Sequence, residues 1–243
     1  MLSEKPWKPE AVLKLGAMIC LSLLAGMIVV AGMGQIFPHL ARRQQEFYAF
    51  VTGALCFQGA ALVWIGLFVR DHGVGWCEAF GFSTGNWKRI LGLGGLAMLV
   101  VLPGTFLLGQ VSEAALTMMG MKPELQAAVK LLQNKPSVGQ FVVYGFGAIL
   151  LAPVAEEAMF RGIFYPTLKQ SGYPRLAMWA TSLLFASTHM NLLAFVPLTF
   201  LAVVLTLLYE KTGNLVVPIL THVLFNAVNF ALLVLQPSWL KMN

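Results

Sequence analysis

The chain of 243 residues is 58% apolar and only 11% charged, and its mean hydropathy is +0.76. Soluble domains carry about 25% charged residues, so this composition excludes an ordinary soluble protein and indicates one that crosses a lipid bilayer several times. Sixteen Lys and Arg against ten Asp and Glu give a net charge of +6. The basic residues are spread over the loops, which favours membrane anchoring and argues against a nucleic-acid partner.

Seven apolar segments follow one another along the chain and predict transmembrane helices. A chain inside the bilayer must satisfy its own backbone hydrogen bonds, and these segments are too long and too uniformly apolar for barrel strands. The expected fold class is therefore all-α, a polytopic transmembrane helical bundle. The segments cover residues 15–37, 47–70, 89–110, 139–168, 175–190, 192–209 and 215–235.

Two connecting segments have features of the membrane–water interface. Residues 70–89 include Trp76 and Trp87, which are typical of aromatic anchors. Residues 123–134 alternate apolar and polar side chains at helical spacing and are too short to span, which predicts either an interfacial helix or a plain connecting helix. A small excess of Lys and Arg on one side favours a cytoplasmic N-terminus. Without a repeat or an internal boundary, residues 1–243 are expected to form one membrane domain.

The fourth apolar segment carries two adjacent carboxylates, Glu156 and Glu157, near its middle. The other eight acidic residues lie in polar segments or at the ends of apolar ones. An ionisable group at membrane depth costs at least about 2.5 kcal/mol and therefore indicates a function. Arg161 follows Glu157 by four residues, which predicts an internal ion pair, whereas Glu156 lies about 100° round the helix and is free to point elsewhere. Pro153 is expected to kink or divide the segment.

Three further polar residues lie in later apolar segments. His189 is late in the fifth, and His222 and Asn226 share one helix face in the seventh because they are four residues apart. Together with Glu156 they can converge from three helices. Such a set suits hydrolysis: a carboxylate takes a proton from water that a histidine orients, and a second histidine and an amide donate to the developing oxyanion.

Other interpretations are open at this point. Glu156, His189 and His222 could instead ligate a divalent metal such as zinc, which would activate the water, although the chain has no His-Glu-x-x-His helix. The buried glutamates could relay protons in a proton-coupled transporter. The protein could also be a non-catalytic scaffold, since transmembrane histidines and asparagines often only bridge helices.

These residues and their spacing resemble the motifs of a known family. It is the CAAX-protease and bacteriocin-processing family of intramembrane endopeptidases, also called the Rce1-like or Abi family. The similarity covers residues 139–229. The three motifs in this chain are Glu156-Glu157-x-x-x-Arg161, Phe185-x-x-x-His189 and His222-x-x-x-Asn226.

The resemblance implies an all-helical membrane protease with up to eight spans, which extends the expected number to seven or eight. Carried over by motif, Glu156 is the general base of a glutamic peptidase and His189 is its partner in holding the water. His222 and Asn226 form the oxyanion site. Glu157 belongs to the same catalytic set, with the arginine of the first motif as its structural support.

The resemblance also sets expectations for cofactors, partners and location. The family was first regarded as metal-dependent, and the mechanism now favoured for it uses no metal. The resemblance therefore implies a site without a cofactor, with zinc as the alternative. The expected partners are a peptide or protein substrate and the lipid bilayer. Compact loops and the lack of a eukaryotic targeting feature point to a multi-pass protein of the bacterial inner membrane. Because bacterial relatives are associated with bacteriocin immunity, a non-catalytic immunity scaffold is the alternative function.

Overall fold

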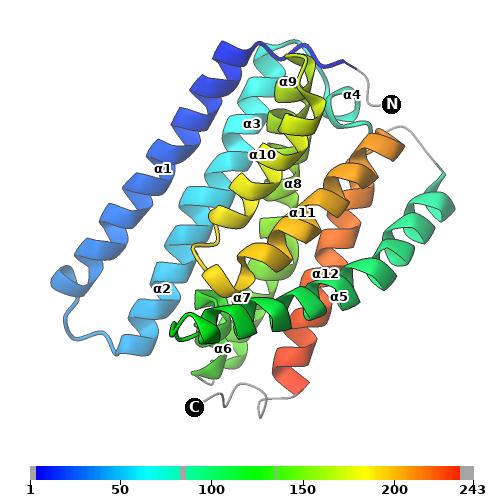
Figure 1. The fold of residues 1–243 in the computed structure, drawn as a ribbon. Helices are drawn as coiled ribbons and strands as arrows, with labels where there is room; N and C mark the ends of the chain where they lie inside the picture. Colours follow the sequence, from blue (N-terminus) through cyan, green and yellow to red (C-terminus); the bar gives the residue numbers. More distant parts are fainter. Residues whose placement is uncertain (1–3, 83–85, 135, 236–243) are drawn as a thin grey trace.

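The computed structural model describes residues 4–82, 86–134 and 136–235, and within these ranges the chain forms helices and no strand. The all-α prediction is confirmed. Figure 1 shows the helices packed in one bundle, with the start of the chain at one end and the last helix ending at the other. In chain order the elements are α1 (Pro9–Ile36), α2 (Arg42–Ala54), η1 (Leu55–Gly59), α3 (Ala60–Asp71), α4 (Trp76–Phe80), α5 (Trp87–Met118), α6 (Ala127–Gln133), α7 (Val138–Phe146), η2 (Gly147–Leu151), α8 (Ala152–Met159), η3 (Phe160–Phe164), α9 (Tyr165–Gln170), α10 (Pro174–Ser187), α11 (Leu192–Thr212) and α12 (Val216–Leu235), where η marks a π-helix.

Each of the seven predicted apolar segments corresponds to one helix or to a run of consecutive helices, so the protein is a multi-pass membrane protein. The fifth segment is α10, which has 14 residues and is therefore about 21 Å long, shorter than the hydrocarbon core of about 30 Å. Six stretches of the described chain are long and apolar enough to cross a membrane: Pro9–Ile36, Arg42–Asp71, Trp87–Met118, Val138–Gln170, Leu192–Thr212 and Val216–Leu235.

Each of the two connections for which an interfacial position was predicted contains a short helix. Helix α4 lies in the connection 70–89, of which residues 83–85 are outside the described residues. Helix α6 occupies most of the segment 123–134 and has 7 residues, too few to span. The Lys130 ammonium lies 2.9 Å from the Glu124 carboxylate, and its hydrogen bond lowers the pKa of that carboxyl group.

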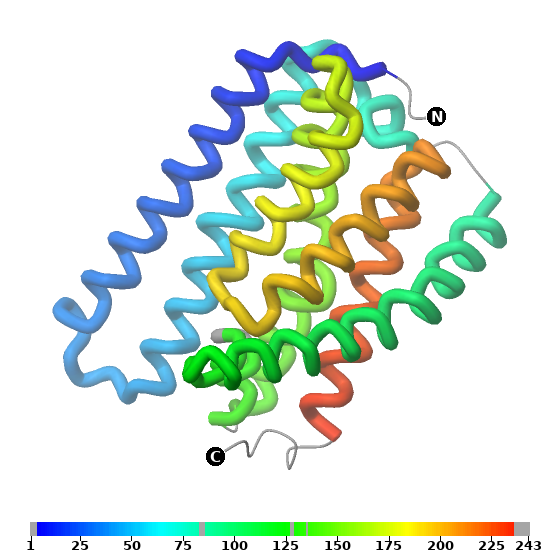
Figure 2. The backbone as a smooth tube through the Cα atoms, viewed as in Figure 1, coloured from blue at the N-terminus to red at the C-terminus, as the bar shows by residue number. Residues whose placement is uncertain are grey.

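Helices α10 and α11 form a pair whose connecting turn carries His189. Figure 2 shows α10 running down from one end of the bundle and ending above the lower end of α2. At the end of α10 the chain turns back into α11. The Asn191 side chain accepts from the Ala194 N–H at 2.9 Å and so caps α11. The same side chain donates to the Glu124 carbonyl at 2.8 Å. The turn is thus tied both to its own helix and to the segment before α6.

The fourth span is interrupted by two π-helices, η2 and η3. In a π-helix each N–H bonds to the carbonyl five residues earlier, and such segments are often found at functional sites. The Ala152 N–H bonds to Gly147 and the Tyr165 N–H to Phe160. A proline comes next in each case, Pro153 and Pro166. The division expected at Pro153 is therefore a change of helical register, and α8 with both glutamates lies between the two π-helices.

The segment before α1 packs against the C-terminal part of the fourth span, at η3 and α9. Trp7 is 5% exposed, and its indole N–H donates to the Gly162 carbonyl at 3.3 Å. Lys5 and Gln170 exchange two hydrogen bonds between backbone and side chain, of 3.2 and 2.8 Å. Burial lowers the pKa of the Lys5 amine, and the charge of Glu78 acts in the opposite direction.

Replacing Trp7 by phenylalanine is expected to lower the free energy of unfolding by about 1–3 kcal/mol, because the aromatic ring is kept while the buried Gly162 carbonyl loses its donor. Thermal unfolding in detergent measures the effect. Trp87→Phe is the matched control, since Trp87 is 63% exposed. Equal melting temperatures for the two variants would show that this hydrogen bond contributes nothing.

Candidate active site

Glu157 is held by two partners in the middle of the bundle. Its side chain has no exposed surface, and its Oε1 accepts from Arg161 Nη1 at 2.8 Å and lies 2.9 Å from His222 Nδ1. The ion pair predicted from the spacing of four residues is present. The partner His222, which comes from α12, was not expected at this carboxylate.

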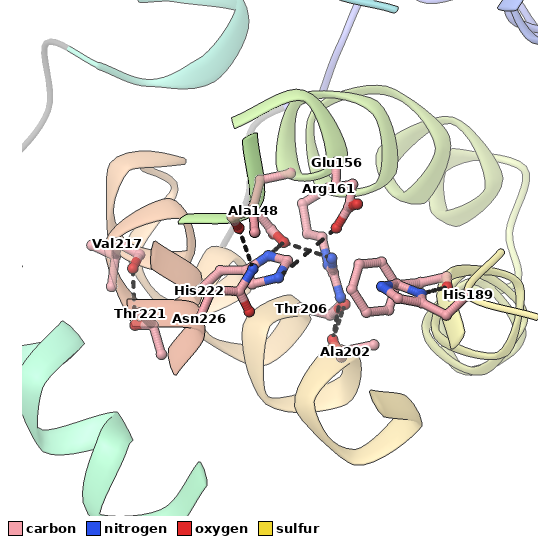
Figure 3. Close-up of polar contacts among 12 residues, drawn as sticks. Ala148, Glu156, Arg161, His189, Ala202, Thr206, Val217, Thr221, His222 and Asn226 are labelled. Carbon is pink, nitrogen blue, oxygen red and sulfur yellow. Dashed lines mark hydrogen bonds and ion pairs between the residues drawn. The ribbon is translucent and has the colours of Figure 1, made fainter. Parts of the chain in front are cut away.

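Arg161 is only 1% exposed, and each part of its guanidinium group has a partner inside the protein. Its Nη2 donates to the Ala202 carbonyl at 2.9 Å and its Nε to the Thr206 hydroxyl at 3.4 Å, both on α11, as Figure 3 shows. The guanidinium carbon lies 4.8 Å from the centre of the Phe185 ring on α10, within the range of a cation–π contact. The arginine therefore joins the fourth span to α10 and α11.

Glu156 points differently from its neighbour, as its position on the helix predicts. Its Oε2 lies 3.8 Å from His222 Nε2, which is longer than a hydrogen bond. The Glu156 side chain also lines a cavity of about 960 Å³, together with His189, His222 and Asn226. Four of the predicted site residues thus meet at one cavity.

Most of the other side chains that line the cavity are apolar, and α2, α5, α6, α11 and α12 contribute many of them. The volume lies in the range of pockets that hold a small ligand or a short stretch of chain.

His222 stands between the two glutamates. Because a carboxylate only accepts hydrogen bonds, the contact with Glu157 requires the proton on Nδ1 of His222. The other ring nitrogen, Nε2, is the one that faces Glu156. The imidazole thus lies between the two carboxylates, and Arg161 compensates the charge of the fully buried one, Glu157.

His189 lies on the other side of Arg161 from His222 (Figure 3). Its Nδ1 is 3.0 Å from the Phe185 carbonyl, so Nδ1 carries the proton and Nε2 can accept. The Phe185 ring centre is 5.1 Å from that of His189 and 5.7 Å from that of His222. Among the described residues the ion-pair contact of Glu156 is with His222 and not with His189, which was the expected partner.

Asn226 lies one turn after His222 on α12 and is half-buried. Its Nδ2 donates to the carbonyl of Ala148 in η2 at 2.8 Å (Figure 3). One of the two amide protons expected to serve an oxyanion is therefore engaged by the backbone of the fourth span.

Residues 138–228 match a family described as type II CAAX prenyl endopeptidase Rce1-like. They contain the two glutamates, the arginine, both histidines and the asparagine of the site. This part of the chain is similar to that family, and residues 138–228 are called the Rce1-like segment below. No solved structure matches the protein.

Three curated bacterial proteins are similar to the chain that carries this Rce1-like segment. The "Uncharacterized protein YpbD" of Bacillus subtilis is 36% identical over 83 residues, 32% of this chain and 40% of that one. The "UPF0177 protein YaiF" of Lactococcus lactis is 28% identical over 150 residues, 60% and 64% of the two chains. An "Uncharacterized 24.3 kDa protein" of Escherichia coli is 33% identical over 133 residues, 52% and 56%. The chain thus spans from 40% to 64% of the length of these relatives.

Zinc was the alternative to a site without a cofactor, with Glu156, His189 and His222 as its ligands. Within the described residues no group of three or more His, Cys, Asp or Glu side chains is placed to hold a metal ion. Of the three, Glu156 and His222 are in ion-pair contact, at 3.8 Å.

Two residues at the site were missed by the sequence-based reasoning. Thr206 on α11 shares its hydroxyl between Arg161 and the Ala202 carbonyl. Gln58, in π-helix η1 and outside the Rce1-like segment, lines the cavity, and its buried Oε1 has no hydrogen-bond partner among the described residues. The signal was available for Gln58, because an amide inside an apolar segment stands out as a histidine does. A threonine in a helix gives no such signal, since it can bond to its own backbone.

Proposed function

We propose that the protein is an intramembrane endopeptidase in which Glu156 is the general base. The observation that supports this most is the division of labour between two adjacent carboxylates. Glu157 is taken up by Arg161 and His222, whereas Glu156 lines the cavity. A general base must reach water and substrate, and of the two glutamates Glu156 is the one that meets this condition.

The proposed reaction is hydrolysis of a peptide bond by one water molecule. Glu156 Oε2 and His222 Nε2 are 3.8 Å apart, so both can bind a single water at ordinary hydrogen-bond lengths. Glu156 takes a proton as the water oxygen attacks the peptide carbonyl carbon. The carbon–nitrogen bond then breaks, and the proton passes to the departing amine.

The other site residues have supporting roles in this proposal. His189 lines the same cavity and has Nε2 available to bind water or substrate. Oxyanion stabilisation would come from the second N–H of Asn226, and from His222 Nε2 when the ring is protonated at both nitrogens, because the Nδ1 proton is bonded to Glu157. No metal or other cofactor is part of the mechanism.

The cavity and the relatives suggest the substrate class and the location. Apolar walls fit a peptide or protein whose cleaved segment enters the bilayer, because polar substrates would lose hydration there. The three relatives are bacterial, and we place the protein in a bacterial inner membrane.

Glu156→Gln is expected to remove cleavage, with a loss of at least about 100-fold, the usual contribution of a general base. The measurement is N-terminal sequencing of membrane proteins from a bacterial host that expresses wild type or variant. Glu10→Gln is the matched control, since Glu10 is an exposed carboxylate in the first turn of α1. New N-termini should be present with wild type and Glu10→Gln and absent with Glu156→Gln. Cleavage that continues in folded Glu156→Gln contradicts the proposal.

A further inference from the structure

The register of π-helix η2 leaves one carbonyl without a backbone partner. The Ala152 N–H bonds to Gly147, five residues earlier. The next donor in that register would be the N–H of residue 153, bonded to Ala148. Residue 153 is a proline and has no N–H, so the Ala148 carbonyl is left open. A buried carbonyl without a donor is costly, and nearly all of them find one.

Asn226 fills this position from another helix. Its Nδ2 lies 2.8 Å from the Ala148 oxygen. His222, one turn earlier on α12, bonds to Glu157 at 2.9 Å. One face of α12 therefore contacts the fourth span on both sides of Pro153, once before it and once after it.

The register of η2 determines the direction of the two glutamates relative to α7. A π-helix places one extra residue in a turn, which rotates everything after it by about 100° relative to what comes before. Glu156 and Glu157 follow η2 within two turns. If η2 relaxed to a regular α-helix, the two carboxylates would turn by that angle relative to α7, and Glu156 would no longer line the cavity.

The second π-helix of the span has a related arrangement, in which the carbonyl lies four residues before the proline and not five. The Tyr165 N–H bonds to Phe160, Pro166 follows, and the Gly162 carbonyl four residues before that proline accepts from the Trp7 indole. In both places a proline removes a backbone donor after a π-helix, and a side chain from a distant segment supplies one nearby.

We propose that Asn226 is a positioning residue, which fixes π-helix η2 by taking the carbonyl that Pro153 leaves open and so directs Glu156 into the cavity. The effect on catalysis rests on the proposed function, whereas the effect on the structure does not. A role as oxyanion donor alone would make Pro153 irrelevant to what happens at Asn226.

The test is a double-mutant cycle with Asn226→Ala and Pro153→Ala. Asn226→Ala is expected to lower the melting temperature in detergent by several degrees, because the carbonyl of Ala148 loses its donor. Pro153→Ala restores an N–H at the position from which Ala148 would be reached in the π register. The double variant should therefore recover most of the loss. Asn229→Ala is the matched control, since Asn229 is exposed and bonds only to the carbonyl of Phe225 on its own helix among the described contacts, and it should melt within about a degree of wild type.

Additive losses of melting temperature in the double variant would overturn the proposal.

A measurement of activity is the second test, which decides the matter if Pro153→Ala alone disturbs the fold. The probe is a quenched fluorescent peptide built on a cleavage site found by the N-terminal sequencing. If Asn226 positions Glu156, Asn226→Ala lowers kcat about 10-fold or more and also moves the acid limb of the pH–rate profile. A fall in kcat with an unmoved acid limb assigns Asn226 to the oxyanion instead. Glu156-independent cleavage would refute the proposed function while leaving the melting-temperature cycle intact.

Discussion

Arg161→Met is expected to lower the free energy of unfolding by about 3–5 kcal/mol, the usual cost of removing one partner from a buried ion pair. The substitution leaves the fully buried Glu157 carboxylate with His222 alone. It also removes the donors to Ala202 and Thr206. Methionine fills much of the same space, so the loss comes from unpaired polar groups and only in small part from a cavity. Thermal unfolding of the purified protein in detergent measures it.

The chain contains a matched control for this variant. Arg42 and Glu46 are also four residues apart and paired at 3.0 Å, but the arginine side chain is 91% exposed. Arg42→Met is expected to cost less than about 1 kcal/mol, since water replaces the lost partner. If Arg161→Met and Arg42→Met melted within a degree of each other, the buried pair would not be the anchor of the fourth span.

The helices could be predicted from the sequence because the signal for each is local. A run of apolar residues identifies a membrane helix without any knowledge of its neighbours. A break between the fifth and sixth segments was predicted at residue 191, but the exact end of α10 could not be found in this way. Residues 175–190 are apolar almost to the end, yet α10 stops at Ser187. The turn depends on Met190, whose φ is 49°, and on the Asn191 cap, and neither changes the hydropathy of the segment. The π-helices are hidden for the same reason, except for the prolines that follow them.

The site was predictable as far as helix geometry reaches. Spacing along one helix gave the Glu157–Arg161 pair and the different direction of Glu156, and the structure has both. The contacts between helices were not predictable. That His222 meets Glu157, and that Asn226 meets Ala148, depends on the rotation and depth of α12 against the fourth span. The rotation and depth are set by packing over the whole bundle. The partners in these two contacts are separated by 65 and 78 positions in the sequence, and no rule of helical spacing applies over such separations.

Gly81→Ala is expected to cost about 2–5 kcal/mol, from two separate causes. Gly81 has a φ of +73°, and any side chain in that conformation costs about 1–2 kcal/mol. A Cβ built there would lie 1.9 Å from the Gly213 carbonyl oxygen, so the backbone must shift, which typically costs about 1–3 kcal/mol more. The contact belongs to the junction between α4 and the turn before α12, where the Leu215 N–H also bonds to the Phe80 carbonyl at 2.9 Å.

Gly120→Ala separates the two causes. Gly120 has nearly the same φ, +72°, and a Cβ there meets no atom within 4 Å, so only the conformational cost of about 1–2 kcal/mol applies. Melting temperatures of the two variants in detergent should differ accordingly, with Gly81→Ala lower. The turn at Gly213 leads directly into α12, which carries His222 and Asn226. A shift there must therefore also reduce cleavage, whereas Gly120→Ala should leave cleavage unchanged. Equal melting temperatures would show that α4 moves away freely and does not hold α12 in place.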